Sequence, residues 1–152
     1  MPDGGQALFS RGYLQNMAHG VVLAVENPAA VGRIYNAADT QALSVRQIAE
    51  MVGNIMGHAW EVVPVPRQLL PRAAQTQGLP YSCDPYDIEP HLLLDLTRIR
   101  AELGYQDQVN VQEALERTVR WLCENPPQPG PAPDYAALDQ AIRKARAVWA
   151  DV

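Results

Sequence analysis

Two arginines of this chain, Arg11 and Arg67, are candidates for binding an anionic ligand. A guanidinium offers paired N–H donors to a phosphate or carboxylate, and such charge-assisted hydrogen bonds are stronger than neutral ones. The alternative is that both are solvated surface residues, because the basic residues of the chain are eleven arginines and one lysine. The residues alone leave both interpretations open, with a phosphate or carboxylate as the ligand class.

A second cluster of polar side chains lies in the stretch YSCDPYD, which contains Tyr81, Asp84, Tyr86 and Asp87. These side chains could line a pocket under the long Pro-rich segment that surrounds them. Turn chemistry explains the Asp-Pro and Tyr-Asp pairs equally well, since Asp and Pro both favour turns. The pattern therefore predicts either a ligand-contacting loop or a structural turn.

The sequence lacks the motifs of a dinucleotide site, a metal site and a disulfide framework. No Gly-x-Gly-x-x-Gly turn occurs, so a dinucleotide phosphate site is not expected in this chain. His19, His58 and His91 are scattered without the spacing of metal ligands, so we expect no metal site. Cys83 and Cys123 are too few for a disulfide framework, which favours free thiols and a reducing cytoplasm.

Composition favours one globular unit of ordinary size. The chain has 152 residues, 47% hydrophobic and 19% charged, with a formal net charge of −5. An acidic balance argues against nucleic acid as a partner, because binding to phosphates needs a basic face. No apolar run approaches the roughly 18 residues that a membrane span requires, so we expect no membrane partner.

The first half of the chain predicts short alternating elements. A short strand is expected at Arg11 to Leu14, then a helix over Asn16 to Glu26 that the Asn27-Pro28 pair ends. Arg33 to Ala37 is typical of a buried strand, and Ala59 to Val65 of an edge strand, because it contains Pro64.

Between those two strands, Ser44 and Gln47 form a capping box that starts a helix with a stripe of Ile48, Val52 and Ile55. Gly57 ends this helix.

The second half predicts a long loop followed by helices. The segment from Pro66 to Pro90 contains five prolines and little hydrophobic periodicity, which indicates a functional loop or lid. A short helix ends at Gly104, and a second helix starts at a cap, Asn110, with a stripe of Leu115, Val119 and Leu122. Pro126 to Pro133 is typical of a stiff linker. Asp134 then caps a last helix, whose apolar stripe is Tyr135, Leu138, Ile142, Ala145 and Trp149.

Several of these segments together resemble the NAD(P)-dependent epimerase/dehydratase family, the extended short-chain dehydrogenases. In that family an Asp-x-Ser/Thr-Lys/Arg segment leads to Leu-Gly-Tyr/Trp and then to a helix ending in Trp and a Pro pair. Asp95 to Pro127 follows this order. The family also has a His/Tyr-Val-x-Asp-x-Ala pattern that opens a helix, a Tyr-Asn strand and a Ser-capped helix. The matching positions here are Tyr13, Asn16 (in place of Asp), Ala18, Ile34-Tyr35-Asn36 and Ser44.

The resemblance covers about Phe9 to Pro127 and implies a substrate-binding lobe without the family's nucleotide-binding half. The family's catalytic Tyr-x-x-x-Lys pair is missing, because the only lysine is Lys144 and Gln140 stands four residues before it. The resemblance therefore implies no bound cofactor in this chain, although the family uses NAD or NADP.

In sugar-nucleotide members of the family, one Arg lies in the strand before the first helix and another in the irregular loop. Phe9 occupies the first of these positions, and Arg11 lies two residues later on the same strand face. Arg67 matches the second. The resemblance and the residue patterns together give a candidate substrate-binding set of Arg11, Tyr13, Asn16, Arg67, Tyr81, Asp84 and Tyr86. For Asn16, a helix cap is the alternative role.

We therefore expect a mixed α/β fold: a small lobe of short strands and helices with no complete Rossmann domain. Its expected divisions are a lobe at 1–125, a linker at 126–133 and a terminal helix at 134–152. The expected function is substrate binding in an epimerase/dehydratase-like protein, with a sugar nucleotide or another anionic small molecule as the ligand. The alternatives are a stand-alone ligand-binding or interaction module, and part of a split enzyme. The expected partner is a second copy or a nucleotide-binding chain, since the terminal helix or the face around Met17 and Val21 would otherwise be uncovered.

Overall fold

The described part of the protein is a small mixed α/β unit with five helices and a two-stranded sheet. The structure, a computed structural model, describes residues 1–69, 91–128 and 135–150. The helices are α1 (Leu14–Glu26), α2 (Val45–Ile55), α3 (Thr97–Leu103), α4 (Val111–Glu124) and α5 (Tyr135–Ala150). Strands β1 (Leu8–Phe9) and β2 (Leu43–Ser44) and the 3-10 turns η1 (Asp3–Gly5), η2 (Pro28–Ala30) and η3 (Arg67–Leu69) complete it. The predicted fold class, without a complete Rossmann domain, is confirmed.

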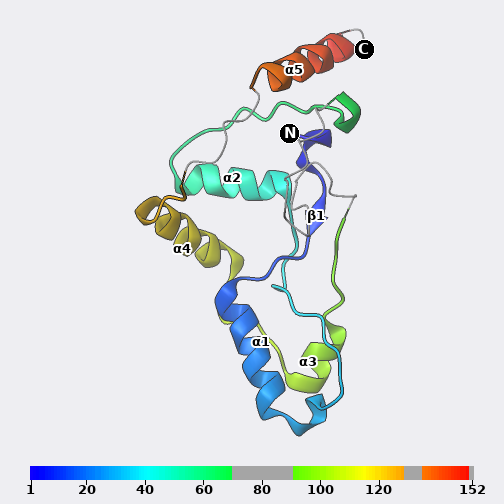
Figure 1. Cartoon of the computed structure of the whole chain (residues 1–152), viewed down its shortest axis with the longest axis vertical. Helices are drawn as coiled ribbons and strands as arrows, with labels where there is room; N and C mark the ends of the chain where they lie inside the picture. Colours follow the sequence, from blue (N-terminus) through cyan, green and yellow to red (C-terminus); the bar gives the residue numbers. More distant parts are fainter. Residues whose placement is uncertain (70–90, 129–134, 151–152) are drawn as a thin grey trace.

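The helices are arranged along the long axis of the molecule (Figure 1). Helices α1 and α3 lie together at one end, α2 and α4 lie in the middle, and α5 lies at the other end. The two central helices pack against each other. No helix within the described ranges is long and apolar enough to cross a bilayer.

The helix boundaries follow local signals in the sequence. Ser44 and Gln47 form the predicted capping box: Ser44 Oγ accepts from the Gln47 amide at 3.1 Å, and Gln47 Oε1 accepts from the Ser44 amide at 2.8 Å. Asn110 Oδ1 accepts from the Glu113 amide at 3.0 Å and so caps α4. Gly104 ends α3 with φ +66°, a left-handed conformation that glycine adopts without steric cost.

The predicted strands were largely wrong in position. Arg11 to Leu14 is not a strand: β1 lies just before it, and Leu14 is already helical. Antiparallel β1 and β2 pair Leu8 with Ser44 and Phe9 with Leu43. In the described part of the chain, the segment 59–65 forms one bridge, between Val65 and Pro2, and 33–37 pairs with no strand. A strand needs a hydrogen-bonded neighbour, and the described part of the chain supplies none for 33–37.

Two apolar clusters form the core. The larger one contains Ala38, Leu96, Ile99, Leu103 and Tyr105, with Met17, Leu23 and Ala24 of α1 packed against it. The second joins Val65 to Ala141 and Ala145 of α5. The terminal helix therefore packs on its own chain.

The buried stripe of α5 differs from the predicted one. Ala145 and the partly buried Ile142 lie on it as predicted, whereas Tyr135 is 66% exposed and Ala141 is buried in its place. Asp134, the predicted cap, lies outside the described residues, as do most of the Pro66–Pro90 loop and of the 126–133 linker. The division into lobe, linker and terminal helix stays a prediction.

Candidate ligand pocket

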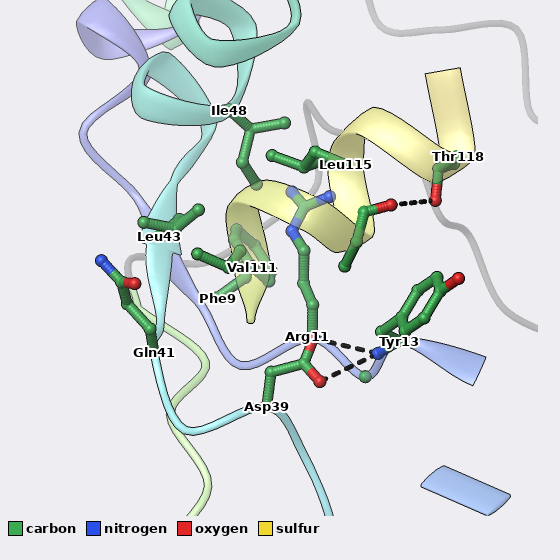
Figure 2. A pocket seen from close by; sticks show the side chains of 12 residues that line it. Phe9, Arg11, Tyr13, Asp39, Gln41, Leu43, Ile48, Val111, Leu115 and Thr118 are labelled. Atoms are coloured by element: carbon green, nitrogen blue, oxygen red, sulfur yellow. Dashed lines mark hydrogen bonds between the residues drawn. The ribbon is translucent and has the colours of Figure 1, made fainter. Parts of the chain in front are cut away.

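A pocket opens where the strand-to-helix junction at Arg11 to Tyr13 faces α2 and the first turns of α4 (Figure 2). Its volume is about 180 Å³. Ligand pockets for drug-sized molecules usually measure about 300–1,000 Å³, so this one fits a single chemical group of a larger ligand. Its lining residues are Phe9, Arg11, Gly12, Tyr13, Asp39, Gln41, Leu43, Ile48, Val111, Ala114, Leu115 and Thr118.

Among the described residues that line this pocket, Arg11 is the only cation. Its side chain extends from the floor of the pocket toward Leu115 and Ile48 (Figure 2). The guanidinium carbon lies 5.7 Å from the centre of the Phe9 ring, within the range of a cation–π contact. Burial lowers the pKa of the Arg11 guanidinium from its usual value, but an arginine keeps its proton in proteins.

Arg11 forms no salt bridge with a residue that the structure describes. In the described ranges no carboxylate lies within 4 Å of its guanidinium nitrogens, whereas other arginines are paired: Arg46 with Glu50 at 2.7 Å and Arg117 with Glu113 at 2.6 Å. Arg11 is exposed at the mouth of the pocket. A cation beside apolar walls is chemically suited to an anionic group such as a phosphate or a carboxylate.

Tyr13 and Asp39 form the polar side of the pocket. The Tyr13 backbone N–H donates to both carboxylate oxygens of Asp39, at 3.1 and 2.9 Å, as Figure 2 shows. The Asp39 N–H in turn donates to the Arg11 carbonyl oxygen at 2.6 Å. Asp39 thereby fixes the turn that carries Arg11 and Tyr13 into α1.

Asn16 lies behind this turn as a fully buried structural residue, with 0% exposure. Its side-chain amide donates to Asp39 Oδ1 at 2.8 Å and to the Val109 carbonyl at 2.9 Å. Its oxygen accepts from the backbone N–H groups of Gln108 and Val109 at 2.9 and 3.0 Å. An Asn side chain has two donors and two acceptor positions, so none is left for a ligand. Asn16 does not cap α1 either, because the cap position is Tyr13.

The structure brings together only part of the predicted site. Arg11 and Tyr13 line one pocket, and Asn16 supports it from behind. Arg67 lies in η3, and its side chain is outside the described residues, as are Tyr81, Asp84 and Tyr86. Their place in a substrate site stays a prediction.

Sequence reasoning missed Asp39, which links the pocket to the buried network. The apolar walls come from the stripes of the two capped helices, with Ile48 from α2 and Leu115 from α4. Both stripes were predicted, but their meeting at Arg11 depends on the tertiary fold.

Metal binding has no support in the described part of the chain, where no group of three or more potential ligand side chains comes together. Cys123 is a free, exposed thiol. Cys83 lies outside the described residues.

Comparison with known proteins supports the predicted resemblance. No protein-family model matches the chain. An uncharacterized Escherichia coli protein, YbjS, is 27% identical over 135 residues, which cover 80% of this chain and 40% of that protein. The rice UDP-D-apiose/UDP-D-xylose synthase is 26% identical over 121 residues, covering 78% of this chain and 29% of the synthase.

Solved structures of epimerase/dehydratase enzymes also resemble this chain in fold. The Bordetella bronchiseptica enzyme WbmF, solved with NAD⁺ and UDP, has a TM-score of 0.55 and 21% identity, and the match covers 99% of this chain and 36% of WbmF. This chain has the fold of part of an NAD-dependent epimerase/dehydratase. The segment that matches this chain makes up 29% to 40% of the length of these curated relatives.

Proposed function

We propose that this chain is a substrate-binding lobe of an NAD-dependent epimerase/dehydratase-like protein, and that its pocket holds an anionic group of a nucleotide sugar. The observation that carries the proposal is the Arg11 guanidinium, charged and without a carboxylate partner in the described ranges, inside a pocket with apolar walls. A phosphate or sugar carboxylate would complete its hydrogen bonds. The small volume of about 180 Å³ suits one such group, with the rest of the ligand outside.

The comparisons support nucleotide sugars as the ligand class. A matching curated protein is named as a UDP-sugar synthase, and a matching structure contains UDP. Both are much longer than the matched segment, so their whole activities are not carried over to this chain.

We further propose that this chain does not perform the redox chemistry by itself. The sequence has no glycine-rich dinucleotide turn and no Tyr-x-x-x-Lys pair. In the proposed function, the lobe binds and orients the substrate, while NAD or NADP and the proton-transferring residues belong to a different polypeptide segment. A chain of this sequence incubated with NAD⁺ and a UDP-sugar should produce no NADH.

Calorimetric titration of the purified chain with UDP and UDP-glucose tests the binding function. Arg11→Ala should weaken binding about ten-fold or more, since losing a charge-assisted bond costs about 1.5–3 kcal/mol. Arg11→Lys should recover only part of the affinity, because an ammonium cannot make the bidentate contact. Arg46→Ala is the matched control, since Arg46 is exposed on α2 and paired with Glu50. Equal affinities for Arg11→Ala and the unmodified chain would contradict the proposed pocket.

A further inference from the structure

The interior of the pocket behind Arg11 is formed by apolar side chains from both strands and from two helices. These side chains are Phe9 of β1, Leu43 of β2, Ile48 of α2, and Val111, Ala114 and Leu115 of α4. They converge on one space between the two helices and the strands (Figure 2). Because apolar walls gain free energy when they exclude water, such a space favours an apolar occupant.

The other polar side chains of this pocket are already bonded or point away from it. Both carboxylate oxygens of Asp39 accept from the Tyr13 backbone N–H, at 3.1 and 2.9 Å. The Thr118 hydroxyl donates to a carbonyl of the preceding helical turn at 2.7 Å. In Figure 2 the Tyr13 hydroxyl and the Gln41 amide point away from the Arg11 guanidinium. Among the described lining residues, Arg11 is therefore the side-chain donor that faces a ligand in this pocket.

A sugar ring is poorly suited to this interior, whereas a hydrocarbon ring fits it. Each sugar hydroxyl would lose its water, and the apolar walls would offer no hydrogen bond in return, which is unfavourable. The pocket volume of about 180 Å³ is close to that of an engineered apolar cavity of about 150 Å³ that binds benzene. The interior therefore has room for one aromatic ring or a branched alkyl group of similar size.

Arg11 adds a contact for an anion at the mouth of this apolar space. We propose that the pocket binds small carboxylates that carry an aryl or branched-alkyl group, with the carboxylate on Arg11 and the apolar group between α2 and α4. Such acids compete with a nucleotide sugar for the same arginine. This inference rests on the proposed function, because both ligands use Arg11, but it assigns the interior of the pocket to a different chemical group.

A series of small acids tests the inference on the unmodified whole chain by NMR titration. Phenylacetate and cyclohexylacetate carry an apolar ring, acetate lacks it, and glucuronate carries its carboxylate on a polar ring. We expect phenylacetate and cyclohexylacetate to bind at least ten-fold more tightly than acetate and glucuronate, because burial of an apolar group of this size changes an equilibrium constant by a factor of ten or more. Phenylacetate should also raise the apparent Kd of UDP in proportion to its concentration.

Two variants change the size of the pocket in opposite directions. Ala114→Leu fills part of the interior, since Ala114 is 5% exposed and lines it, and should weaken phenylacetate binding ten-fold or more. Leu115→Ala enlarges the interior and should shift the preference from phenylacetate toward the larger 1-naphthylacetate by at least five-fold. Ala101→Leu is the matched control for Ala114→Leu, because Ala101 is exposed on α3 and does not line the pocket. Melting temperatures show whether each variant is folded, and Leu115→Ala decides the question if Ala114→Leu is not.

The outcomes separate this inference from the proposed function. Preferred binding of the two apolar acids that follows the size of the pocket supports the inference. Equal binding of phenylacetate, acetate and glucuronate overturns it, even if UDP binding depends on Arg11 and the proposed function holds. Phenylacetate binding that neither Leu115→Ala nor a folded Ala114→Leu changes also overturns it, because the ring would then lie elsewhere. If UDP does not bind, the proposed function fails, and the acid series together with Arg11→Ala, which should weaken phenylacetate binding ten-fold or more, still decides for or against this inference.

Discussion

Helices α1 and α2 are similar in length but face their surroundings in opposite ways. Helix α2 packs its apolar side against α4 and presents charged residues to water, including the Arg46–Glu50 pair at 2.7 Å. Within the described residues α1 makes no ion pair, and exposed apolar residues form a stripe along its outer side. The difference is that α2 covers its apolar side within this chain, whereas the outer apolar stripe of α1 is exposed.

The two regions are also stabilised differently. Helices α2 and α4 begin at side-chain caps. Each cap joins a side chain to a backbone N–H group three residues later in the chain. Helix α1 has no side-chain cap, and its first turn is held by the buried contacts of Asn16 and Asp39 with distant segments. Stability in the α1 region therefore depends on a long-range polar network, and in the α2–α4 region on local caps and apolar packing.

The largest expected effect comes from breaking the buried network. Asn16→Ala removes four hydrogen bonds and leaves the N–H groups of Gln108 and Val109 and the Asp39 carboxylate without this partner. We expect a loss of about 3 kcal/mol or more in the free energy of unfolding, measured by urea denaturation. Asn125→Ala is the matched control, because Asn125 is exposed and, within the described residues, its side chain donates to the Trp121 carbonyl alone; it should cost less than about 1 kcal/mol. Similar losses for the two variants would contradict the assigned role of Asn16.

A smaller, pH-dependent effect concerns Tyr105, which is 1% exposed and lies against Gly20 of α1. Burial, together with the negative charges of Asp107 and Asp39, raises the pKa of the Tyr105 hydroxyl to about 12. The unfolded chain loses this proton near pH 10, so the folded state binds more protons between these values. Stability should therefore be unaffected by this group below about pH 10 and fall as the pH rises toward 12.

Tyr105→Phe tests this sign. The buried Tyr105 hydroxyl has no hydrogen-bond partner among the described residues, so the variant should be about as stable as the unmodified protein at pH 7. Its unfolding free energy, measured by denaturant titration, should fall less steeply above pH 10. Parallel curves for the two proteins would show that Tyr105 does not titrate on unfolding.

Removal of a local cap should have a moderate effect. Ser44→Ala deletes the acceptor of the Gln47 amide and one half of the capping box, at an expected cost of about 1 kcal/mol in thermal or urea unfolding. Asn110→Ala should cost a similar amount for α4. Costs as large as that of Asn16→Ala would remove the contrast between local and long-range stabilisation.

The smallest effect is expected on the outer side of α1. Val25→Lys should change the stability of the chain alone by no more than about 0.5 kcal/mol, because Val25 is already 81% exposed. Val52→Lys, on the partly buried side of α2, is the comparison and should be clearly destabilising. A large loss for Val25→Lys in the monomeric chain would mean that the outer stripe is covered within this chain.

Helix starts and stops were well predicted from the sequence. Ser44, Gln47, Asn110 and Gly104 act on backbone groups within a few residues, so their roles can be read from local spacing. The strands at 33–37 and 59–65 were predicted wrongly, because alternating or apolar residues indicate only that a segment suits a sheet. Whether it becomes a strand depends on a partner far away in the chain or outside it.

The candidate site divides in the same way. The sequence by itself determined the helices, the absence of a glycine-rich dinucleotide turn, and Arg11 and Tyr13 as candidates at the strand-to-helix junction. Only the tertiary structure decided that Arg11 faces the stripes of α2 and α4, that Asp39 holds its turn, and that Asn16 is buried and fully bonded. The physical reason is range: caps and turns act between near neighbours, whereas burial and hydrogen bonds such as Asn16 to Val109, 93 residues apart, depend on where the whole chain folds.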